Sequence, residues 1–397
     1  MTRLLIAVCA LGLGGTLLAG CGSGDKAASR DGAGAAAGRV DIRVSQCGGG
    51  WTAPRDGRLD LTVTNRYSEV ADVYLADPRT GGVYDELEGL APGASAKIDA
   101  TLGGGRYQLQ CYTGENNPWR GPVVHVVSSA APAERTPGVV PVTFADLIEP
   151  SKAYQKWITS RLPVLLAQVT ALRTAVAGGS TAAAETAWVK AHMTYETLGA
   201  AYDAFGPLNE KINGAPSGSQ TWREDHDLAG FHLIEGLLWS GAPRAQIVPA
   251  VTRLQHDVQR LIKQFVTAEI APADLPLRSH EIIENAIQFE LNEATDEGSH
   301  TTLATVTANL AGARKALSFV APLLRTRYPR LGETQQALAA AQTQLAAYGR
   351  DGRWTPLRSL STLRRRQVDA SLESLAELLA PVAAIGDIRD TVRAAGL

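Results

Sequence analysis

A histidine and a glutamate interrupt an otherwise apolar segment, GFHLIEGLLW, which covers residues 230–239. His232 and Glu235 are three residues apart, so on a helix they present an imidazole nitrogen and a carboxylate on one face. A carboxylate among apolar neighbours costs free energy unless a cation or a hydrogen-bonded ion pair compensates it. The spacing therefore indicates either part of a metal site or a structural pair, and the segment alone favours the structural pair.

Further candidate ligands strengthen the case for a metal site. The charged run REDHD occupies residues 223–227, and Glu196 lies one predicted helix earlier. Later in the chain, further acidic residues follow at Glu293, Asp296 and Glu297. Helical bundles with two-metal centres combine Glu and His at i and i+3 with carboxylates from facing helices. Oxygen-rich ligation with one imidazole suits iron, zinc or manganese better than Cu(I), which prefers sulfur ligands.

The first residues have the pattern of an export signal. Arg3 precedes an apolar run over residues 4–18, and the following LAGC resembles the lipobox of bacterial lipoproteins. We expect residues 1–20 to be removed as a signal peptide and Cys21 to be lipidated, which would tether the protein to the outer face of a membrane. A plain secretory signal is the alternative.

Two cysteines, Cys47 and Cys111, remain after such cleavage. Because disulfides persist outside the cytoplasm, we expect the two to be bridged. Closing a loop of this length stabilises a domain by roughly 4 kcal/mol in the chain-entropy model. A pair of soft copper ligands is the alternative. A blue-copper site is excluded, because residues 22–149 contain one histidine, His125, and no methionine.

Composition divides the rest of the chain into four parts. Residues 21–38 are small and polar, as in a flexible tether, and residues 129–145 read as a proline-containing linker. Residues 39–128 hold short strand-like segments between turns, which predict an antiparallel β-sandwich: VDIRV, LDLTVTN, ADVYLAD, AKIDATL, RYQLQCY and PVVHVV. Residues 146–397 have helical periodicity, with helices predicted near 148–177, 181–204, 225–240, 243–268, 276–294, 301–326, 332–348, 357–380 and 383–395.

The predicted fold class is thus multidomain, a β domain followed by an all-α domain of one or two antiparallel bundles. A longer polar loop is expected from Pro207 to Gln220. The 38 basic and 40 acidic residues nearly cancel, so no overall positive field attracts nucleic acid. Nucleic acid is therefore excluded as a partner class.

The order of these features resembles EfeO-type proteins, which join a cupredoxin-like domain to an imelysin, or peptidase M75-like, domain. The resemblance rests on the lipobox, the cysteine-bearing β domain, the linker, Tyr195-Glu196 and the pattern REDxxxxGFHxIE over residues 223–235. It implies a cupredoxin-like β-sandwich before an imelysin-like helical bundle. It also implies a periplasmic or lipid-anchored iron-binding component, whose partners are an iron permease and a haem peroxidase.

The resemblance further implies a ligand set for iron, as Fe2+ or Fe3+, with zinc or copper as substitutes in vitro. The implied ligands are His232, Glu235, Glu196, Glu224 or Asp225, and one of Glu293, Asp296 and Glu297. The chain departs from its relatives at Gly199 and His226, where they often carry acidic residues, and lacks an arginine before Ser299. In the β domain, the resemblance implies a cysteine-and-carboxylate site, but the matching strand of this chain has only one acidic residue, Asp72.

Two other functions stay open. A metalloenzyme, either hydrolytic or oxidising ferrous iron, would need an open coordination position and a general base. No catalytic residue is predicted, and the chain lacks the HExxH motif of zincin peptidases. An interaction protein with a purely structural charged cluster would lose stability, but no metal affinity, when His232 and Glu235 are removed.

Overall fold

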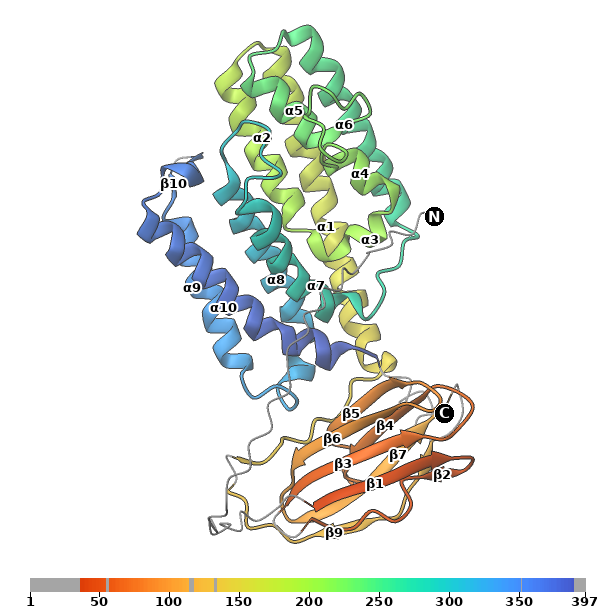
Figure 1. Ribbon diagram of the computed structural model, residues 1–397. Coiled ribbons are helices and arrows are strands. Elements are labelled where there is room, and N and C mark those ends of the chain that lie inside the picture. Colours follow the sequence, from red (N-terminus) through yellow and green to blue (C-terminus); the bar gives the residue numbers. More distant parts are fainter. Residues whose placement is uncertain (1–35, 55–56, 114–117, 132–133, 351, 389–397) are drawn as a thin grey trace, which may run out of the picture.

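The computed structural model describes residues 36–388 apart from 55–56, 114–117, 132–133 and 351. Strands form the first part of the chain and helices the second (Figure 1), so the predicted β domain followed by an all-α domain is confirmed. The predicted signal peptide and the lipidation site Cys21 lie outside the described residues. Among the helices that are described, none is long and apolar enough to cross a membrane.

The β domain consists of two sheets, one ordered β2-β1-β3-β6 and the other β5-β4-β7-β8, with β9 paired to β7. Neighbouring strands are antiparallel except β1 and β3, which are parallel. The strands are β1 (Ala36–Arg43), β2 (Gln46–Cys47), β3 (Arg58–Asn65), β4 (Ala71–Ala76), β5 (Val83–Leu90), β6 (Ser95–Thr101), β7 (Gly105–Tyr112), β8 (Trp119–Arg120) and β9 (Val124–Val126).

Side-chain alternation explains why the two sheets pack together. Every second residue of β3 is buried, including Leu59, Leu61 and Val63, and these pack in one core with Val73 and Leu109 of the other sheet. The sequence did not predict β5, because its charged and glycine residues mask the alternation. β1 begins inside the predicted tether, since its first residues pair in register with β3.

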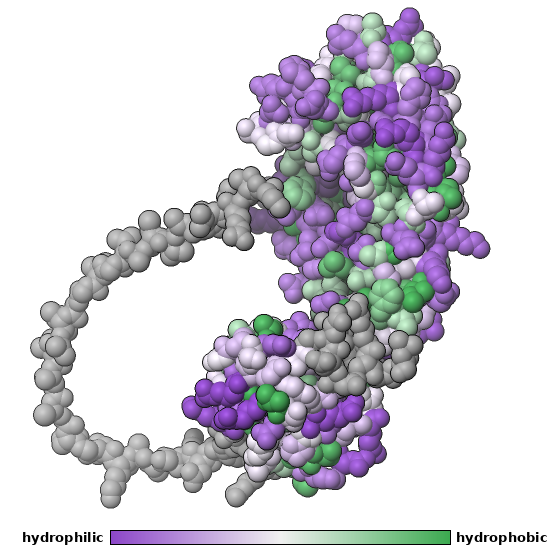
Figure 2. Space-filling view, turned by 90° about the vertical axis from the view of Figure 1, so that its right-hand side faces the viewer, coloured by the Kyte–Doolittle hydropathy of each residue, from purple (hydrophilic) through white to green (hydrophobic). Residues whose placement is uncertain are grey.

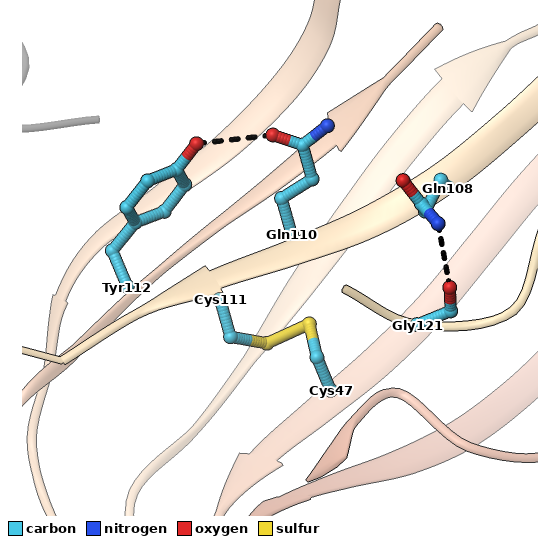
Figure 3. The surroundings of a disulfide bond; sticks show 6 residues. All are labelled: Cys47, Gln108, Gln110, Cys111, Tyr112 and Gly121. Carbon is cyan, nitrogen blue, oxygen red and sulfur yellow. Dashed lines mark hydrogen bonds between the residues drawn. A yellow bond between two sulfur atoms is a disulfide. The ribbon is translucent and has the colours of Figure 1, made fainter. Parts of the chain in front are cut away.

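The predicted disulfide between Cys47 and Cys111 is present and joins β2 of one sheet to β7 of the other (Figure 3). The two Cα atoms are 5.6 Å apart, and both residues are buried in the core of the sandwich. Because both sulfurs are in the bond, neither is a thiolate that could bind copper.

Ten α-helices are described in the second part of the chain. They are α1 (Phe144–Ala177), α2 (Thr181–Glu196), α3 (Tyr202–Phe205), α4 (Pro207–Asn213), α5 (Gly230–Trp239), α6 (Arg244–Phe265), α7 (Asp274–Asn285), α8 (Thr302–Leu324), α9 (Leu331–Ala346) and α10 (Thr362–Gly386). Shorter elements are the 3-10 turns η2 (Gly199–Ala201) and η4 (Leu357–Ser359), the π-helix η3 (Ala286–Glu290), and the hairpin strands β10 (Gly349–Arg350) and β11 (Arg353–Trp354).

The long helix α1 organises the bundle. Thr143 and Asp146 form a capping box at its start, and apolar residues at three- and four-residue steps bury one face against α2, α6 and α8. Figure 1 shows these helices lying side by side above the β domain. Hydrophilic side chains cover most of the face shown in Figure 2, with apolar ones scattered among them, as expected when the apolar faces are turned inward.

The linker predicted at 129–145 is attached to both domains. Val139 exchanges two backbone hydrogen bonds of 2.9 Å with Val83 of β5. On the helical side, Nε of Arg327 donates to the carbonyl oxygen of Val140 at 2.9 Å. These bonds hold the β domain against the lower end of the bundle (Figure 1).

Four predictions for the helical part are wrong in detail. α2 ends at Glu196 rather than at 204, and the predicted polar loop from Pro207 begins with α4, which has a proline in its first turn. α5 begins at Gly230 rather than at 225. α10 continues through Pro381, where two helices were predicted, because buried residues on both sides of the proline keep this part of the helix in the core. Residues 389–395 of the second predicted helix lie outside the described residues.

Candidate metal centre

A pocket of about 290 Å³ lies among α2, α4, α5, α7, η3 and α8. Its lining includes several side chains with possible ligand atoms, among them Glu196, Asn213, His232, Glu290 and Asn309. We call this cavity the central pocket. Arg278 also borders the pocket and forms ion pairs with Asp203, which is exposed, and with Glu281, which is partly exposed. The pocket thus combines a buried acidic interior with a charged border.

Glu196 is the last residue of α2 and is buried. Nδ2 of Asn213 donates to its Oε1 at 2.7 Å, and Nδ2 of Asn309 donates to its Oε2 at 2.9 Å. Nε2 of His192 lies 3.1 Å from the same Oε1. Burial raises the pKa of Glu196, but the hydrogen bonds and charge of these neighbours outweigh it, so its pKa is lower than usual. This carboxylate is therefore held in its charged form.

His232 lines the central pocket from α5, and its position depends on how this helix begins. Gly230 has a φ of 77°, and a Cβ atom there would lie 2.1 Å from the carbonyl oxygen of Ile212 in α4. Glycine therefore lets α5 start against α4. Burial lowers the pKa of His232, but the hydrogen bond and charge of Glu235 outweigh it, so the pKa is raised.

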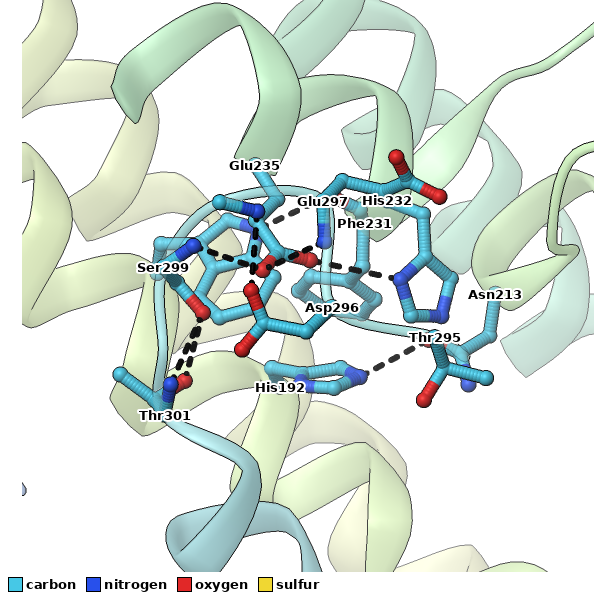
Figure 4. A network of polar contacts seen from close by, with 12 residues as sticks. His192, Asn213, Phe231, His232, Glu235, Thr295, Asp296, Glu297, Ser299 and Thr301 are labelled. Carbon is cyan, nitrogen blue, oxygen red and sulfur yellow. Dashed lines mark hydrogen bonds and ion pairs between the residues drawn. The ribbon is translucent and has the colours of Figure 1, made fainter. Parts of the chain in front are cut away.

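Glu235 lies behind His232 and does not line the pocket. Its Oε2 is 3.4 Å from Nδ1 of His232, while its Oε1 accepts hydrogen bonds of 3.1 Å from the backbone N–H groups of Glu297 and Ser299 (Figure 4). Metal-binding histidines commonly use their second ring nitrogen in this way, to contact a carboxylate that fixes the ring. The geometry gives Glu235 the role of orienting His232 and holding the loop after η3.

Glu290 reaches the pocket from the last position of the π-helix η3. Its Oε2 accepts a hydrogen bond of 2.7 Å from Oγ1 of Thr295. Burial, followed by the charge of Glu196, raises the pKa of Glu290 to about 7. Two carboxylates with opposite pKa shifts therefore share the central pocket.

The two acidic residues predicted before α5 have other partners. Asp225 accepts hydrogen bonds from the backbone N–H groups of Ser217, Asp227 and Leu228, and its pKa is lowered chiefly by the first of these. Glu224 is exposed and accepts from the N–H and the hydroxyl of Thr221, which lower its pKa. Neither residue lines the central pocket. Both stabilise the turns that lead into α5.

The acidic residues after η3 lie on one loop over residues 291–301. Burial raises the pKa of Glu297, and the charge of His232 opposes this shift. Glu293 and Asp296 are not in the lining of the central pocket; they lie beside His300 instead. The structure therefore separates residues that the sequence placed at a single site.

Four polar residues around the pocket were not predicted. His192 could have been found, because it precedes Glu196 by one helical turn. Glu290, Asn213 and Asn309 come from three other elements, and no local spacing connects them. Oδ1 of Asn309 is buried and has no hydrogen-bond partner among the described residues, so the pocket offers an amide oxygen as well as carboxylate and imidazole groups.

The fold and the site define a two-domain protein in which a β-sandwich precedes a helical bundle with a buried pocket of carboxylate, imidazole and amide groups. The family model described as Peptidase_M75: Imelysin matches residues 150–382, more than half of the chain. The chain belongs to the imelysin family.

Curated relatives match beyond this family domain. The "Iron uptake system component EfeO" of Yersinia pestis is 25% identical over 299 residues, which cover 75% of this chain and 78% of that protein. The protein of the same name from Escherichia coli (strain K12) is 23% identical over 299 residues, with the same coverage of 75% and 78%. The resemblance to EfeO-type proteins is confirmed.

Proposed function

We propose that this protein binds iron in the central pocket, on the outer side of a cell membrane, and delivers it to a membrane permease of an iron uptake system. The names of its relatives support the iron uptake role. The predicted lipobox at Cys21 supports attachment to the membrane surface. A haem peroxidase of the same system is the second proposed partner.

The observation that carries the proposal is the convergence of Glu196, Glu290 and His232 on one pocket. Oδ1 of Asn309, which has no partner in the part of the chain that is described, adds to it. Two carboxylates, one imidazole and one amide oxygen form a ligand set that suits Fe2+ or Fe3+, and also Zn2+ or Mn2+. A cation would compensate the cost of the buried carboxylate of Glu196 and the half-buried carboxylate of Glu290, and it would give the amide oxygen of Asn309 a partner.

Each residue has a distinct part in binding. Glu196 is kept charged chiefly by His192 and further by its two amide donors, so it attracts a cation without first losing a proton. Nδ1 of His232 faces Glu235, which leaves Nε2 as the nitrogen available to a cation. Capture and release then involve the making and breaking of bonds between the ligands and the metal, with no change in the covalent bonds of the protein.

A hydrolytic role is the second candidate, because the description of the matching family includes a peptidase. It would need a general base beside a metal-bound water. Glu235 does not line the pocket, and its oxygens already face His232 and two backbone N–H groups. The geometry therefore favours binding over hydrolysis.

Calorimetric titration with Fe2+ under anaerobic conditions tests the proposal. Glu196→Gln and His232→Ala should each weaken binding by at least tenfold, an effect on the order of the 10–100-fold that even outer-shell changes cause in metal sites. His256→Ala is the control, because His256 is an exposed histidine of the same bundle. Equal affinity in wild type and both pocket variants would contradict the proposal.

A further inference from the structure

The loop over residues 291–301 carries a second group of possible ligands. One ligand atom from each of Glu293, Asp296 and His300 lies within 4.8 Å of the other two. Two ligands of one transition-metal ion are separated by at most about 4.4 Å, twice a metal–oxygen bond of about 2.2 Å. A small contraction of these side chains would therefore bring all three atoms onto a single ion.

One carboxylate oxygen of this group has no hydrogen-bond donor among the described residues. Oε1 of Glu293 is buried and has no hydrogen-bond partner among the described residues, although Glu293 as a whole is partly exposed. A buried carboxylate oxygen without a donor is costly, and a cation is one of the few groups that can compensate it. The part of the chain that is described shows no ion pair between either carboxylate and a lysine or arginine.

Asp296 is already oriented for such a role. Its side chain is 5% exposed, its Oδ1 accepts hydrogen bonds from the N–H groups of Gly298 and His300, and Oγ1 of Thr302 donates to its Oδ2 at 3.3 Å. Nδ1 of His300 lies 3.6 Å from Oδ1, and its side chain is 33% exposed. The group thus has a fixed inner ligand and a face open to solvent.

We propose that Glu293, Asp296 and His300 form a second cation site, separate from the central pocket, for a divalent transition metal such as Fe2+, Mn2+ or Zn2+. Two carboxylate oxygens and one imidazole nitrogen suit these ions, and solvent completes the coordination on the open side. The site does not depend on the proposed function of the central pocket, since the two sites share no ligand.

An ion at this site would also act on the His232–Glu235 pair. The N–H groups of Glu297 and Ser299, which donate to Glu235, belong to the same loop and lie between Asp296 and His300 in sequence. Fixing the two ends of this stretch on one ion fixes the donors between them. The second site would thereby stabilise the backbone that holds His232 toward the central pocket.

The number of bound Co2+ ions per chain, measured by equilibrium dialysis and metal analysis, tests the proposal. The protein is used without its predicted signal peptide. Glu293→Gln/His300→Asn removes two ligands but keeps Asp296, and asparagine tolerates the left-handed conformation of residue 300, where φ is 54°. The matched control is His280→Asn/Glu284→Gln, a His–Glu pair on α7 whose atoms lie 3.6 Å apart.

We expect wild type and control to bind two ions per chain and Glu293→Gln/His300→Asn to bind one. Glu196→Gln/Glu290→Gln, which alters the central pocket, should also bind one ion, and the variant with all four changes should bind none. If Glu293→Gln/His300→Asn binds as many ions as wild type, the second site is refuted, whatever the central-pocket variant does. A central-pocket variant that keeps both ions would contradict the proposed function and leave the second site standing.

Discussion

Replacing Glu235 with alanine should lower the free energy of unfolding of the helical domain even when no metal is bound. In the structure, Oε1 of Glu235 is the acceptor for two backbone N–H groups, those of Glu297 and Ser299, at 3.1 Å each. A donor left without its acceptor on burial costs about 1–3 kcal/mol. Both donors are partly exposed, so water replaces part of the lost hydrogen bonding and the cost of each donor stays in the lower part of this range. For the two donors together, the expected loss in the free energy of unfolding is about 2 to 4 kcal/mol.

Glu235→Gln separates the hydrogen bonds from the charge. The glutamine oxygen can still accept from both N–H groups, and the amide of the new side chain faces His232, so we expect a loss of about 1 kcal/mol, the difference between a charged and a neutral acceptor. The assay is urea unfolding of metal-free protein followed by far-UV circular dichroism, which reports the helices. Glu284→Ala, at an exposed position of α7, is the control and should change stability little.

The reasoning would be refuted if Glu235→Ala and Glu235→Gln were equally stable. Equal and small losses would show that the loop does not depend on this carboxylate. Equal and large losses would show that the charge, rather than the two hydrogen bonds, holds the loop.

Two further predictions follow from the ionisation of Glu290 and from the disulfide. The pKa of Glu290 is about 7 in the folded protein against an ordinary 4.5, so the folded state binds more protons between these values and the stability of metal-free protein falls as pH rises through them, by up to about 3 kcal/mol. Unfolding free energies of wild type and Glu290→Gln should therefore diverge from about pH 5 to about pH 8, and a constant difference would contradict the shift. Cys47→Ser/Cys111→Ser should lower the stability of the β domain by roughly 4 kcal/mol; thermal unfolding at a fixed scan rate measures this, and an unchanged transition would show that the bond adds nothing.

The sequence predicted the two-domain fold because its signals are local. Alternating residues such as Leu59, Leu61 and Val63 identify half-buried strands, and three- and four-residue apolar steps identify α1. β5 was missed because its charged residues interrupt the alternation, and α4 was missed because a short helix between glycines looks like a loop. Proline inside α10 was read as a helix end, but tertiary packing overrides that local preference.

The site was predictable only in part, for the same reason. His232 and Glu235 share a helix, so their spacing can be seen in the sequence. That His232 lines the pocket while Glu235 binds backbone N–H groups depends on a loop some sixty residues away in sequence. Glu290 projects from a π-helix, whose wider turn does not follow the helical period. Asp225 is the same residue type as a metal ligand, yet its oxygens are used by the N–H groups of a turn. Residue type alone cannot separate these two uses of a carboxylate.

The position of a bound iron ion tests the central claim most directly. Crystals soaked with Fe2+ under anaerobic conditions should show an anomalous difference peak at the iron absorption edge, bounded by Glu196, His232 and Glu290 in the central pocket. A pocket without a peak, in crystals whose iron lies only beside Glu224 and Asp225 or is absent, would contradict the proposal that this pocket carries the iron.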